Sequence, residues 1–258
     1  MRITSLLENT ASRSDMLVEH GLSLHIQTKK HNILFDMGQT DMFFKNTTML
    51  GIDLENVDIA VLSHGHYDHG GGLSKFLEIN RKAPVFINRN AFLPYYNGTQ
   101  KYIGINIELK NNQRIVFVDD VYVIDDELSI FSCNERIRKY SFDSFGLTQK
   151  TSEGFIPDSF EHEQYLLIND GEKRVLISGC SHKGILNIEE WFAPKVLVGG
   201  FHFSKMELGD ELLNASKILD RYDTDYYTCH CTGIEQYEFM KNQMSSLGYL
   251  SCGMSIEI

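Results

Sequence analysis

Short apolar segments separated by turn-prone residues fill the first third of the chain. Residues 3–7, 21–28 and 32–36 are rich in β-branched and other apolar side chains, which predicts three strands. Apolar and polar positions alternate within 21–28, as they do in a strand with one buried face. Residues 43–50 have the pattern of a helix. Residues 57–62 are apolar except for Asp58, a run that is typical of a buried central strand.

Strand-like and helix-like patterns alternate in the last third of the chain. In between, residues 90–160 contain clustered Tyr and Phe, an alternating stretch at 114–124 and a polar stretch at 148–163. We expect this segment to be an elaboration over the core, such as a lid or an extra hairpin. The order of elements indicates one α/β domain over residues 1–258, with two sheets between helices, although other α/β layouts also fit. The further predicted strands are 164–168, 174–178, 196–198 and 226–228, and the further predicted helices are 72–79, 184–192, 207–221 and 233–244.

The strongest chemical signal directly follows the apolar run 57–62. Imidazole and carboxylate groups are ligands that zinc, manganese and iron accept. In an extended stretch His64 and His66 point to the same side, so one ion can bind both. A glycine-rich turn would aim Asp68 and His69 at a second ion. The alternative is a His-rich surface loop, but polar groups beside a buried strand need partners. The motif consists of His64, His66, Asp68 and His69.

This motif resembles the His-x-His-x-Asp-His signature of the metallo-β-lactamase superfamily. Residues 34–38, which read LFDMG, resemble that superfamily's LFDxG strand and turn. The resemblance implies an α/β fold, the αββα sandwich of two mixed sheets flanked by helices. It also implies that Asp36 braces the metal loop, since ligating histidines need a partner on the other ring nitrogen. A turn residue at a strand end is the plainer interpretation of Asp36, and the two are compatible.

Three later histidines, His182, His202 and His230, each follow an apolar, strand-like run. Ligand-binding groups of α/β proteins stand at such strand ends. The resemblance implies two divalent metal ions with one further histidine for each, so at least one of the three has another role. The plainer interpretation of any one of them is a hydrogen-bonded histidine of the core.

The resemblance assigns the metal ligands to two sets. His182 is expected to complete the first set with the two leading histidines of the motif. His230 is expected to complete the second set with Asp68 and His69. Zinc is the metal expected at both positions, and manganese and iron are the alternatives.

The cysteines depart from the family pattern. Most members of the superfamily have a bridging aspartate where this chain has Cys180, which leaves a thiolate bridge, a water bridge or a weak second site as alternatives. We interpret Cys180 as a buried structural thiol, the commonest role of a cysteine. Cys229 and Cys231 flank His230, and a Cys-x-Cys pair can bind metal. Strand alternation, however, predicts that both thiols point away from His230 into the core.

Shorter matches along the chain resemble one branch of the superfamily, the metal-dependent hydrolases related to dihydropterin–ribofuranosylaminobenzene 5'-phosphate synthase. This resemblance implies that Asn9, Glu19 and His20 lie at strand ends near the metals, where they contact the substrate or the ligands. A turn at Asn9 and an exposed loop at Glu19 and His20 are the alternatives. The matching segments are residues 7–10, 18–23, 51–54, 179–182 and 200–202.

The family resemblance implies a metal-dependent hydrolase that uses a metal-bound hydroxide on an ester, a lactone or a phosphoester. Asp68 or His202 would move the proton to the leaving group. The branch resemblance suggests a transferase that condenses a dihydropterin diphosphate with a ribofuranosylaminobenzene phosphate, with aromatic residues at 92–96 and 140–146 as a lid. A non-enzymatic metal- or ligand-binding module is the third alternative, although the ligand set is complete. Redox chemistry at a di-iron site is the fourth.

Charge and composition limit the kinds of partner that the protein is expected to bind. The formal net charge of −11 argues against nucleic acid or an anionic membrane as the main partner. No stretch reaches the roughly 20 apolar residues that span a bilayer, and the first residues do not resemble a signal peptide. The five irregularly spaced cysteines do not indicate a disulfide framework. We therefore expect a reduced, cytoplasmic protein that acts on a small molecule, phosphorylated or pterin-like.

Overall fold

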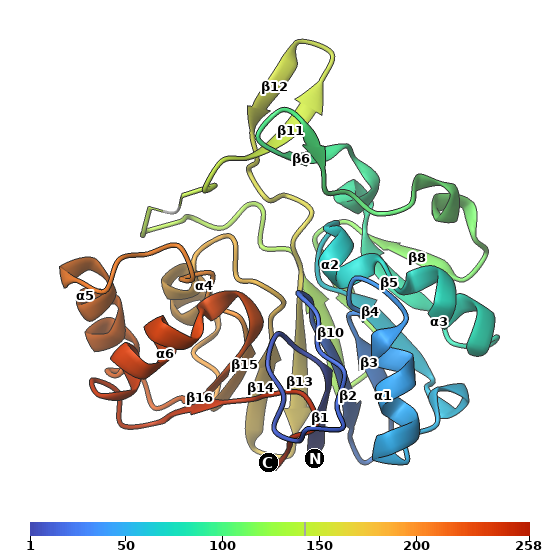
Figure 1. Ribbon diagram of the computed structural model, residues 1–258, viewed down its shortest axis with the longest axis horizontal. Coiled ribbons are helices and arrows are strands. Elements are labelled where there is room, and N and C mark those ends of the chain that lie inside the picture. Colours follow the sequence, from blue (N-terminus) through green and yellow to red (C-terminus); the bar gives the residue numbers. More distant parts are fainter. Residues whose placement is uncertain (142) are drawn as a thin grey trace.

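Two seven-stranded sheets lie face to face between two layers of helices in the computed structural model of the protein (Figure 1). The structure describes residues 1–141 and 143–258. Apolar side chains fill the space between the sheets and the space under each helical layer, so the layers are held together by three separate apolar clusters. This arrangement confirms the predicted αββα sandwich.

The first sheet contains the amino-terminal half of the sandwich and the last strand of the chain. Its four strands β3, β4, β5 and β8 run parallel, whereas β18, β1 and β2 pair antiparallel. The strand order is β18 (Ser255–Glu257), β1 (Arg2–Leu7), β2 (Ser23–Gln27), β3 (Asn32–Phe35), β4 (Ile59–Leu62), β5 (Val85–Asn88) and β8 (Ile115–Val118).

The second sheet contains most of the carboxy-terminal half. Strands β14 to β17 run parallel, and β13, β10 and β9 continue the sheet antiparallel. The parallel strands place the residues that follow them at one shared edge of the sheet, which is where the later histidines are found. The strand order is β17 (Leu247–Tyr249), β16 (Asp225–Thr228), β15 (Val196–Gly199), β14 (Lys173–Ile177), β13 (Tyr165–Asp170), β10 (Leu128–Phe131) and β9 (Val121–Val123).

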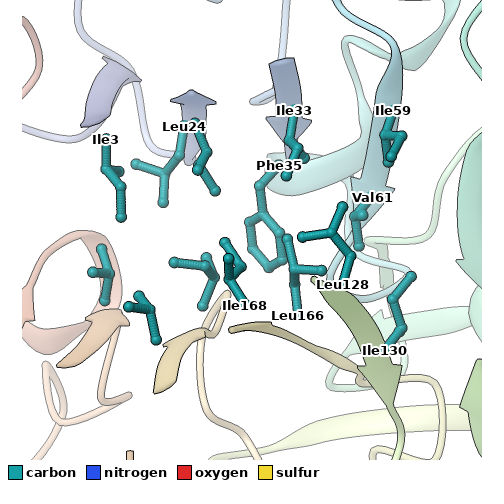
Figure 2. Packing of buried hydrophobic residues seen from close by; sticks show 14 of the residues in the cluster. Ile3, Leu24, Ile33, Phe35, Ile59, Val61, Leu128, Ile130, Leu166 and Ile168 are labelled. Carbon is teal, nitrogen blue, oxygen red and sulfur yellow. The ribbon is translucent and has the colours of Figure 1, made fainter. Parts of the chain in front are cut away.

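The central apolar cluster lies between the two sheets. Figure 2 shows Leu24 and Phe35 of the first sheet facing Leu166 and Ile168 of the second, and all four are fully buried. Burial of one such side chain stabilises the fold by about 1.5–3 kcal/mol. The cluster therefore fixes the distance between the sheets, and with it the distance between the loops that each sheet contributes to the site.

Helices cover the outer face of each sheet (Figure 1). Helices α1 (Met42–Leu50) and α3 (Leu73–Ile79) bury Phe43, Leu73 and Phe76 against the first sheet. Helices α4 (Ile185–Phe192), α5 (Asp210–Leu219) and α6 (Ile234–Lys241) bury their apolar faces against the second sheet. All five lie within a few residues of the predicted ranges. Because each helix buries one apolar face, the sequence shows the apolar periodicity of a helix in each of these segments.

The prediction for residues 90–160 was wrong in part. The alternating stretch 114–124 forms β8 and β9, and β10 follows, so these residues extend the two main sheets and are not an elaboration over the core. The remainder forms a third sheet that projects from the sandwich (Figure 1, top). Its strands, in order, are β12 (Gly154–Pro157), β11 (Leu147–Thr151), β6 (Tyr95–Asn97) and β7 (Lys101–Tyr102).

The third sheet contacts the loop that follows β4. The backbone N–H of Tyr67 donates to the carbonyl of Ile103 at 2.8 Å, and His66 forms an isolated antiparallel bridge with Gly104. The segment 140–146 was predicted to form part of a lid. It includes Phe142, which lies outside the described residues. Within 1–141 and 143–258, no helix has both the length and the apolar character needed to cross a membrane.

Candidate metal centre

The loop after β4 carries the first half of the centre. His66 precedes α2 (Tyr67–Gly70), a single helical turn that contains Asp68 and His69. This turn places Asp68 Oδ2 and His69 Nε2 at 3.5 and 3.2 Å from His230 Nε2. Gly65 is needed for close approach, because a Cβ there would overlap the carbonyl oxygen of Ala91. No positive φ is recorded for Gly65, so space and not backbone angle requires the glycine.

The second half of the centre comes from the loops after three parallel strands. His182 follows β14, His202 follows β15 and His230 follows β16. His202 and His230 have positive φ angles of 57° and 48°, and so does Ser181 beside His182. Such conformations cost non-glycine residues about 1–3 kcal/mol each and persist where the surroundings impose them. Tight, strained turns at these three strand ends thus direct the three rings toward the loop after β4.

Buried carboxylates hold two of these turns. Glu8 accepts the backbone N–H of His230 at 2.6 Å, and Glu163 accepts the backbone N–H of His182 at 2.6 Å. Both carboxylates are fully buried. Neither residue is recognisable in the sequence, because a carboxylate that binds a backbone amide far away in the chain leaves no local pattern. They fix the backbone of the candidate ligands and do not join the centre themselves.

The first set of predicted ligands is brought together. His64 Nε2 and His182 Nε2 lie 3.3 Å apart, and the ring of His66 has its centroid 4.6 Å from that of His64 and 5.0 Å from that of His182. One nitrogen from each of the three rings lies within 4.8 Å of the others. Three buried imidazoles in this arrangement form an open face for one metal ion.

The second set is also brought together. His69 Nε2 lies 3.2 Å from His230 Nε2. Asp68 Oδ2 lies 3.5 Å from His230 Nε2 and 3.9 Å from His69 Nε2. A carboxylate and two imidazoles therefore converge next to the first set, since the rings of His64 and His69 have centroids only 4.1 Å apart.

Hydrogen bonds fix the protonation of the rings in the motif. Asp36 Oδ2 accepts from His69 Nδ1 at 2.7 Å, so this nitrogen carries the hydrogen. The Ser63 hydroxyl donates to the same carboxylate at 2.7 Å and therefore must accept from His64 Nδ1 at 2.8 Å. In both rings Nε2 is left with a free lone pair that points into the centre. Asp36 thus lies where the resemblance implied.

Asn9 gives His230 the same tautomer. Asn9 Oδ1 accepts the backbone N–H of Gly21 at 3.3 Å, which identifies it as the amide oxygen. The same oxygen lies 2.8 Å from His230 Nδ1, which must therefore donate. The Nε2 lone pairs of His69 and His230 consequently face each other at 3.2 Å and cannot bond to one another. Only a cation, either a proton or a metal ion, reconciles the two lone pairs.

The electrostatics of the centre favour a cation. Burial lowers the pKa of His69, but the carboxylates of Asp36 and Asp68 outweigh this effect and raise the pKa to about 9. Burial also raises the pKa of Asp68, yet His69, His20 and His230 together hold it well below its usual range. Burial and the neighbouring rings lower the pKa of His64 well below its ordinary value, so this imidazole stays neutral. A neutral imidazole and a charged carboxylate are the forms that bind metal.

Two ring nitrogens of the first set bear on how the residues fit a metal. In the described part of the chain, His66 Nε2 and His182 Nδ1 are buried without a hydrogen-bond partner. Such atoms are rare in folded proteins, because each loses its hydration without compensation. The nitrogen of His182 that faces His64 is Nε2, so its unpaired Nδ1 lies on the other side of the ring, and the fit to a divalent ion rests on the convergence of imidazole and carboxylate groups.

The residues expected near the substrate divide into two groups. His20 Nε2 lies 3.2 Å from Asp68 Oδ2, and its side chain is 58% exposed, so the ring borders the centre. Glu19 instead accepts the backbone N–H groups of Gln39 and Thr40 at 3.0 and 2.9 Å. Glu19 therefore holds the loop after β3, and none of its hydrogen bonds reaches the centre.

A further pair beside the centre was not predicted. Asp158 Oδ2 lies 3.1 Å from His162 Nε2 and 3.8 Å from His66 Nε2. His162 Nδ1 accepts the backbone N–H of Gly65 at 2.9 Å. Asp158 and His162 belong to the polar stretch 148–163. Nothing in the sequence of this stretch predicts that it lies beside the motif.

The predicted orientation of Cys231 was wrong. The chain leaves the strand at Cys229, and His230–Thr232 form a 3₁₀ turn, so alternation stops at this point. Cys229 lies in the central apolar cluster as expected. Cys231 instead lies beside Cys180 and donates to its carbonyl oxygen at 3.4 Å. Cys180 is not merely a core thiol, because its Sγ lies 3.1 Å from His69 Nε2.

Two cavities meet at the centre. One, of about 210 Å³, is bordered by both cysteines, by Asp68 and by Lys101 and Lys205. The other, of about 220 Å³, is lined by aromatic side chains such as Tyr140 and Phe145. His182 and His202 line both cavities. A small molecule that occupies both would place one end beside the histidines and the other among aromatic rings.

Comparisons with known proteins give a consistent result. The family described as "Metallo-beta-lactamase superfamily" matches residues 18–222. The "Uncharacterized protein MJ0448" of Methanocaldococcus jannaschii is 31% identical over 270 residues, which cover 99% of this chain and 100% of that protein. The 7,8-dihydropterin-6-methyl-4-(beta-D-ribofuranosyl)-aminobenzene-5'-phosphate synthase of the same organism is 26% identical over 287 residues, covering 100% and 96%. The solved structure of Tm1679, a metal-dependent hydrolase of the beta-lactamase superfamily, matches with a TM-score of 0.85 at 29% identity, covering 100% and 99%.

Proposed function

Because the chain belongs to the metallo-β-lactamase superfamily, we propose that it is a metal-dependent hydrolase that opens an ester, a lactone or a phosphoester. One observation carries this proposal: Asp36 and Asn9 hold Nδ1 of His69 and His230, so the two Nε2 atoms face each other at 3.2 Å, where a metal ion that displaces the shared proton would bind both. The similarity to Tm1679 over the full length supports it.

The proposal assigns two divalent ions, with zinc as the first choice and manganese or iron as alternatives. When bound, such ions supply Lewis acidity that lowers the pKa of a water molecule and stabilises negative charge on the reacting oxygen. The convergence of one nitrogen from each of His64, His66 and His182, and the 3.2 Å approach of His69 Nε2 to His230 Nε2, support this choice of ligands. The proposed ligands are His64, His66 and His182 for the first ion and Asp68, His69 and His230 for the second.

Two side chains are positioned to move protons. Asp68 borders the cavity, and its Oδ2 lies 3.5 Å from His230 Nε2, so its carboxylate is placed to take a proton from the attacking water. His202 stands where the two cavities meet and is only partly buried, so it can pass a proton to the leaving group. His20, exposed beside Asp68, is left to contact the substrate.

The cavities define the expected substrate. Lys101 and Lys205 border the cavity beside the histidines, and their positive charge favours a substrate with an anionic group such as a phosphate. The aromatic lining of the neighbouring cavity favours a flat ring at the other end of the substrate. A phosphorylated or pterin-like small molecule meets both conditions.

A second candidate is a transferase that joins a dihydropterin diphosphate to a ribofuranosylaminobenzene phosphate. The specific observation in its favour is the 26% identity to a synthase of this kind over the whole chain. In this case the same residues would bind the diphosphate, and water would have to be kept out. The third sheet supplies Asn97, Lys101 and Leu147 to the cavity border, so it is the part of the fold suited to that task.

The test is turnover by protein reconstituted with zinc or manganese. The substrates are bis(p-nitrophenyl) phosphate, p-nitrophenyl acetate and a γ-lactone, together with the two co-substrates of the synthase. We expect hydrolysis that disappears with a chelator and returns with metal, and that falls at least 100-fold in His64→Ala and Asp68→Asn. Lys29→Ala, which changes an exposed side chain remote from the centre, is the matched control.

Each outcome decides between the candidates. Chelator-sensitive hydrolysis that is lost in both variants supports the hydrolase. Consumption of both co-substrates without hydrolysis of either replaces it by the transferase. A folded, metal-loaded protein that shows neither activity would contradict both the hydrolase and the transferase, and would favour a metal- or ligand-binding module.

A further inference from the structure

Two thiols and one imidazole form a further donor group beside the histidines, and Cys180 Sγ also lies 3.1 Å from His69 Nε2. Cys180, Cys231 and His202 each direct one donor atom to a common point, and the three atoms lie within 4.8 Å of one another. The two cysteines are 3% and 5% exposed, and all three residues border the cavity beside the centre. A dissolved ion can therefore reach this group through the cavity, although little solvent covers the sulfur atoms.

The chain makes room for this arrangement. The 3₁₀ turn at His230–Thr232 carries the side chain of Cys231 out of the strand and into the centre. Gly200 lies against that thiol, and a Cβ at this position would overlap the sulfur atom. Any other residue at position 200 would push Cys231 away from Cys180. The juxtaposition of the two thiols is thus specified by backbone geometry on two neighbouring strands, β15 and β16.

The imidazole of the group has an unused nitrogen. His202 Nδ1 is buried, and none of the described residues is a hydrogen-bond partner for it. The ring lies 4.2 Å from that of His182, measured between centroids, which keeps it at the border of the histidine centre. A buried ring nitrogen without a partner loses its hydration without compensation unless a ligand binds there.

We propose that Cys180, Cys231 and His202 bind a thiophilic divalent cation, such as zinc or cadmium, in addition to the ions of the histidine centre. Zinc binds sulfur at about 2.3 Å and nitrogen at about 2.0–2.1 Å, so donors around one ion stand about 3.5 Å apart. The group has to close by little more than about 1 Å, which side-chain rotation allows. Binding releases the two thiol protons to solvent and leaves a dithiolate–imidazole site, open on the cavity side for water or substrate.

The other histidine-flanking cysteine shows the contrast. Cys229 is fully buried among the apolar side chains of the central cluster and belongs to none of the candidate donor groups found in residues 1–141 and 143–258. Cys229 directly precedes His230 and Cys231 directly follows it. The two cysteines therefore have equivalent positions in the sequence but different surroundings in the fold. Cys229→Ala is therefore the matched control for Cys231→Ala.

The test is the absorption spectrum of the protein titrated with cobalt(II). Cobalt bound to thiolate shows a ligand-to-metal charge-transfer band in the near ultraviolet, and cobalt bound only to imidazole and carboxylate does not. We expect the band in the parent and in Cys229→Ala. We expect its intensity to fall by about half in Cys180→Ala and in Cys231→Ala, and to vanish in the double variant, because each removes one of two sulfur ligands.

Two results would overturn the proposal: cobalt that binds without the band, or a band that depends on Cys180 but is unchanged in Cys231→Ala. If a variant fails to fold, the proposal is tested on the native parent protein by alkylation of its cysteines followed by mass spectrometry. Zinc should slow modification of both Cys180 and Cys231 at least tenfold, and equal rates with and without zinc at Cys231 contradict the site. Both experiments measure only whether the cysteines bind a metal ion, so a negative result would not contradict the proposed hydrolase.

Discussion

The Asp36 carboxylate accepts the Nδ1 hydrogen of His69 at 2.7 Å, at the end of β3 and 33 residues before its partner. The backbone of Asp36 is in the left-handed region, with φ of 59°, which turns the carboxylate back toward the loop after β4. The second carboxylate oxygen accepts the backbone N–H of Ser63 at 2.7 Å. One side chain therefore fixes both the tautomer of a proposed ligand and the start of the loop that carries it.

Asp36→Asn is expected to weaken metal binding by about 10–100-fold, because His69 loses the acceptor that holds its hydrogen on Nδ1. The dissociation constant is measured by competition with a chromophoric chelator. Asp53→Asn is the control, since Asp53 accepts a backbone N–H at the start of a 3₁₀ turn outside the centre. Equal affinities of parent and Asp36→Asn would show that the bond does not tune the ligand.

Loss of a histidine is expected to remove one manganese ion. Manganese favours nitrogen and oxygen ligands over thiolate, so it reports on the histidine centre alone. We expect about two equivalents of manganese in the parent and about one in His182→Ala or in His230→Ala, measured by elemental analysis after gel filtration. His31→Ala serves as the control, because His31 binds Asp125 at 2.7 Å, away from the centre. Unchanged manganese content in both variants would contradict the ligand assignment.

Metal affinity is expected to rise with pH until about pH 9. The carboxylates of Asp36 and Asp68 raise the pKa of His69 to about 9, so in the metal-free protein this ring binds a proton below that pH. A metal ion has to displace the proton, which costs up to tenfold in affinity for each pH unit below 9. In Asp36→Asn the pKa of His69 falls, and the pH at which the affinity levels off should fall with it. A pH-independent affinity between pH 6 and 9 would refute this linkage.

Gly65→Ala is expected to destabilise the metal-free protein by about 1–3 kcal/mol, because its Cβ would overlap the carbonyl oxygen of Ala91. The free energy of unfolding is measured by urea denaturation. Gly209→Ala is the matched control, since no atom lies within 4 Å of a Cβ at that position. If the two variants are equally stable, the loop after β4 is less constrained than its contacts indicate.

Lys205→Met is expected to raise KM for a phosphodiester about fivefold with a smaller effect on a neutral ester. The ammonium group borders the cavity but is exposed, and exposed charge pairs contribute about 1 kcal/mol or less. Lys45→Met is the control, because Lys45 pairs with Asp41 on α1. An equal rise in KM for both substrates would mean that the lysine shapes the cavity without selecting for charge.

Local pattern was enough to predict much of the fold. The apolar run that ends at Leu62 forms β4, and His64 lies two residues beyond its carboxyl end, because a strand buried on both faces is apolar along its length. The predicted helices are all present because each buries one apolar face. Residues 114–124 were misplaced, since alternation identifies a strand but not the sheet that it joins.

The sequence by itself determined which side chains can bind metal, because the spacing of His64, His66, Asp68 and His69 on one short loop is a local property. Only the tertiary structure decided what stands around them. Glu8 reaches the backbone of His230 across 222 residues, and Cys231 turns toward the centre because a 3₁₀ turn interrupts the strand. Contacts of this kind depend on which strand ends meet at one edge of the sandwich, and that is set by the packing of two sheets rather than by any neighbouring residue in the chain.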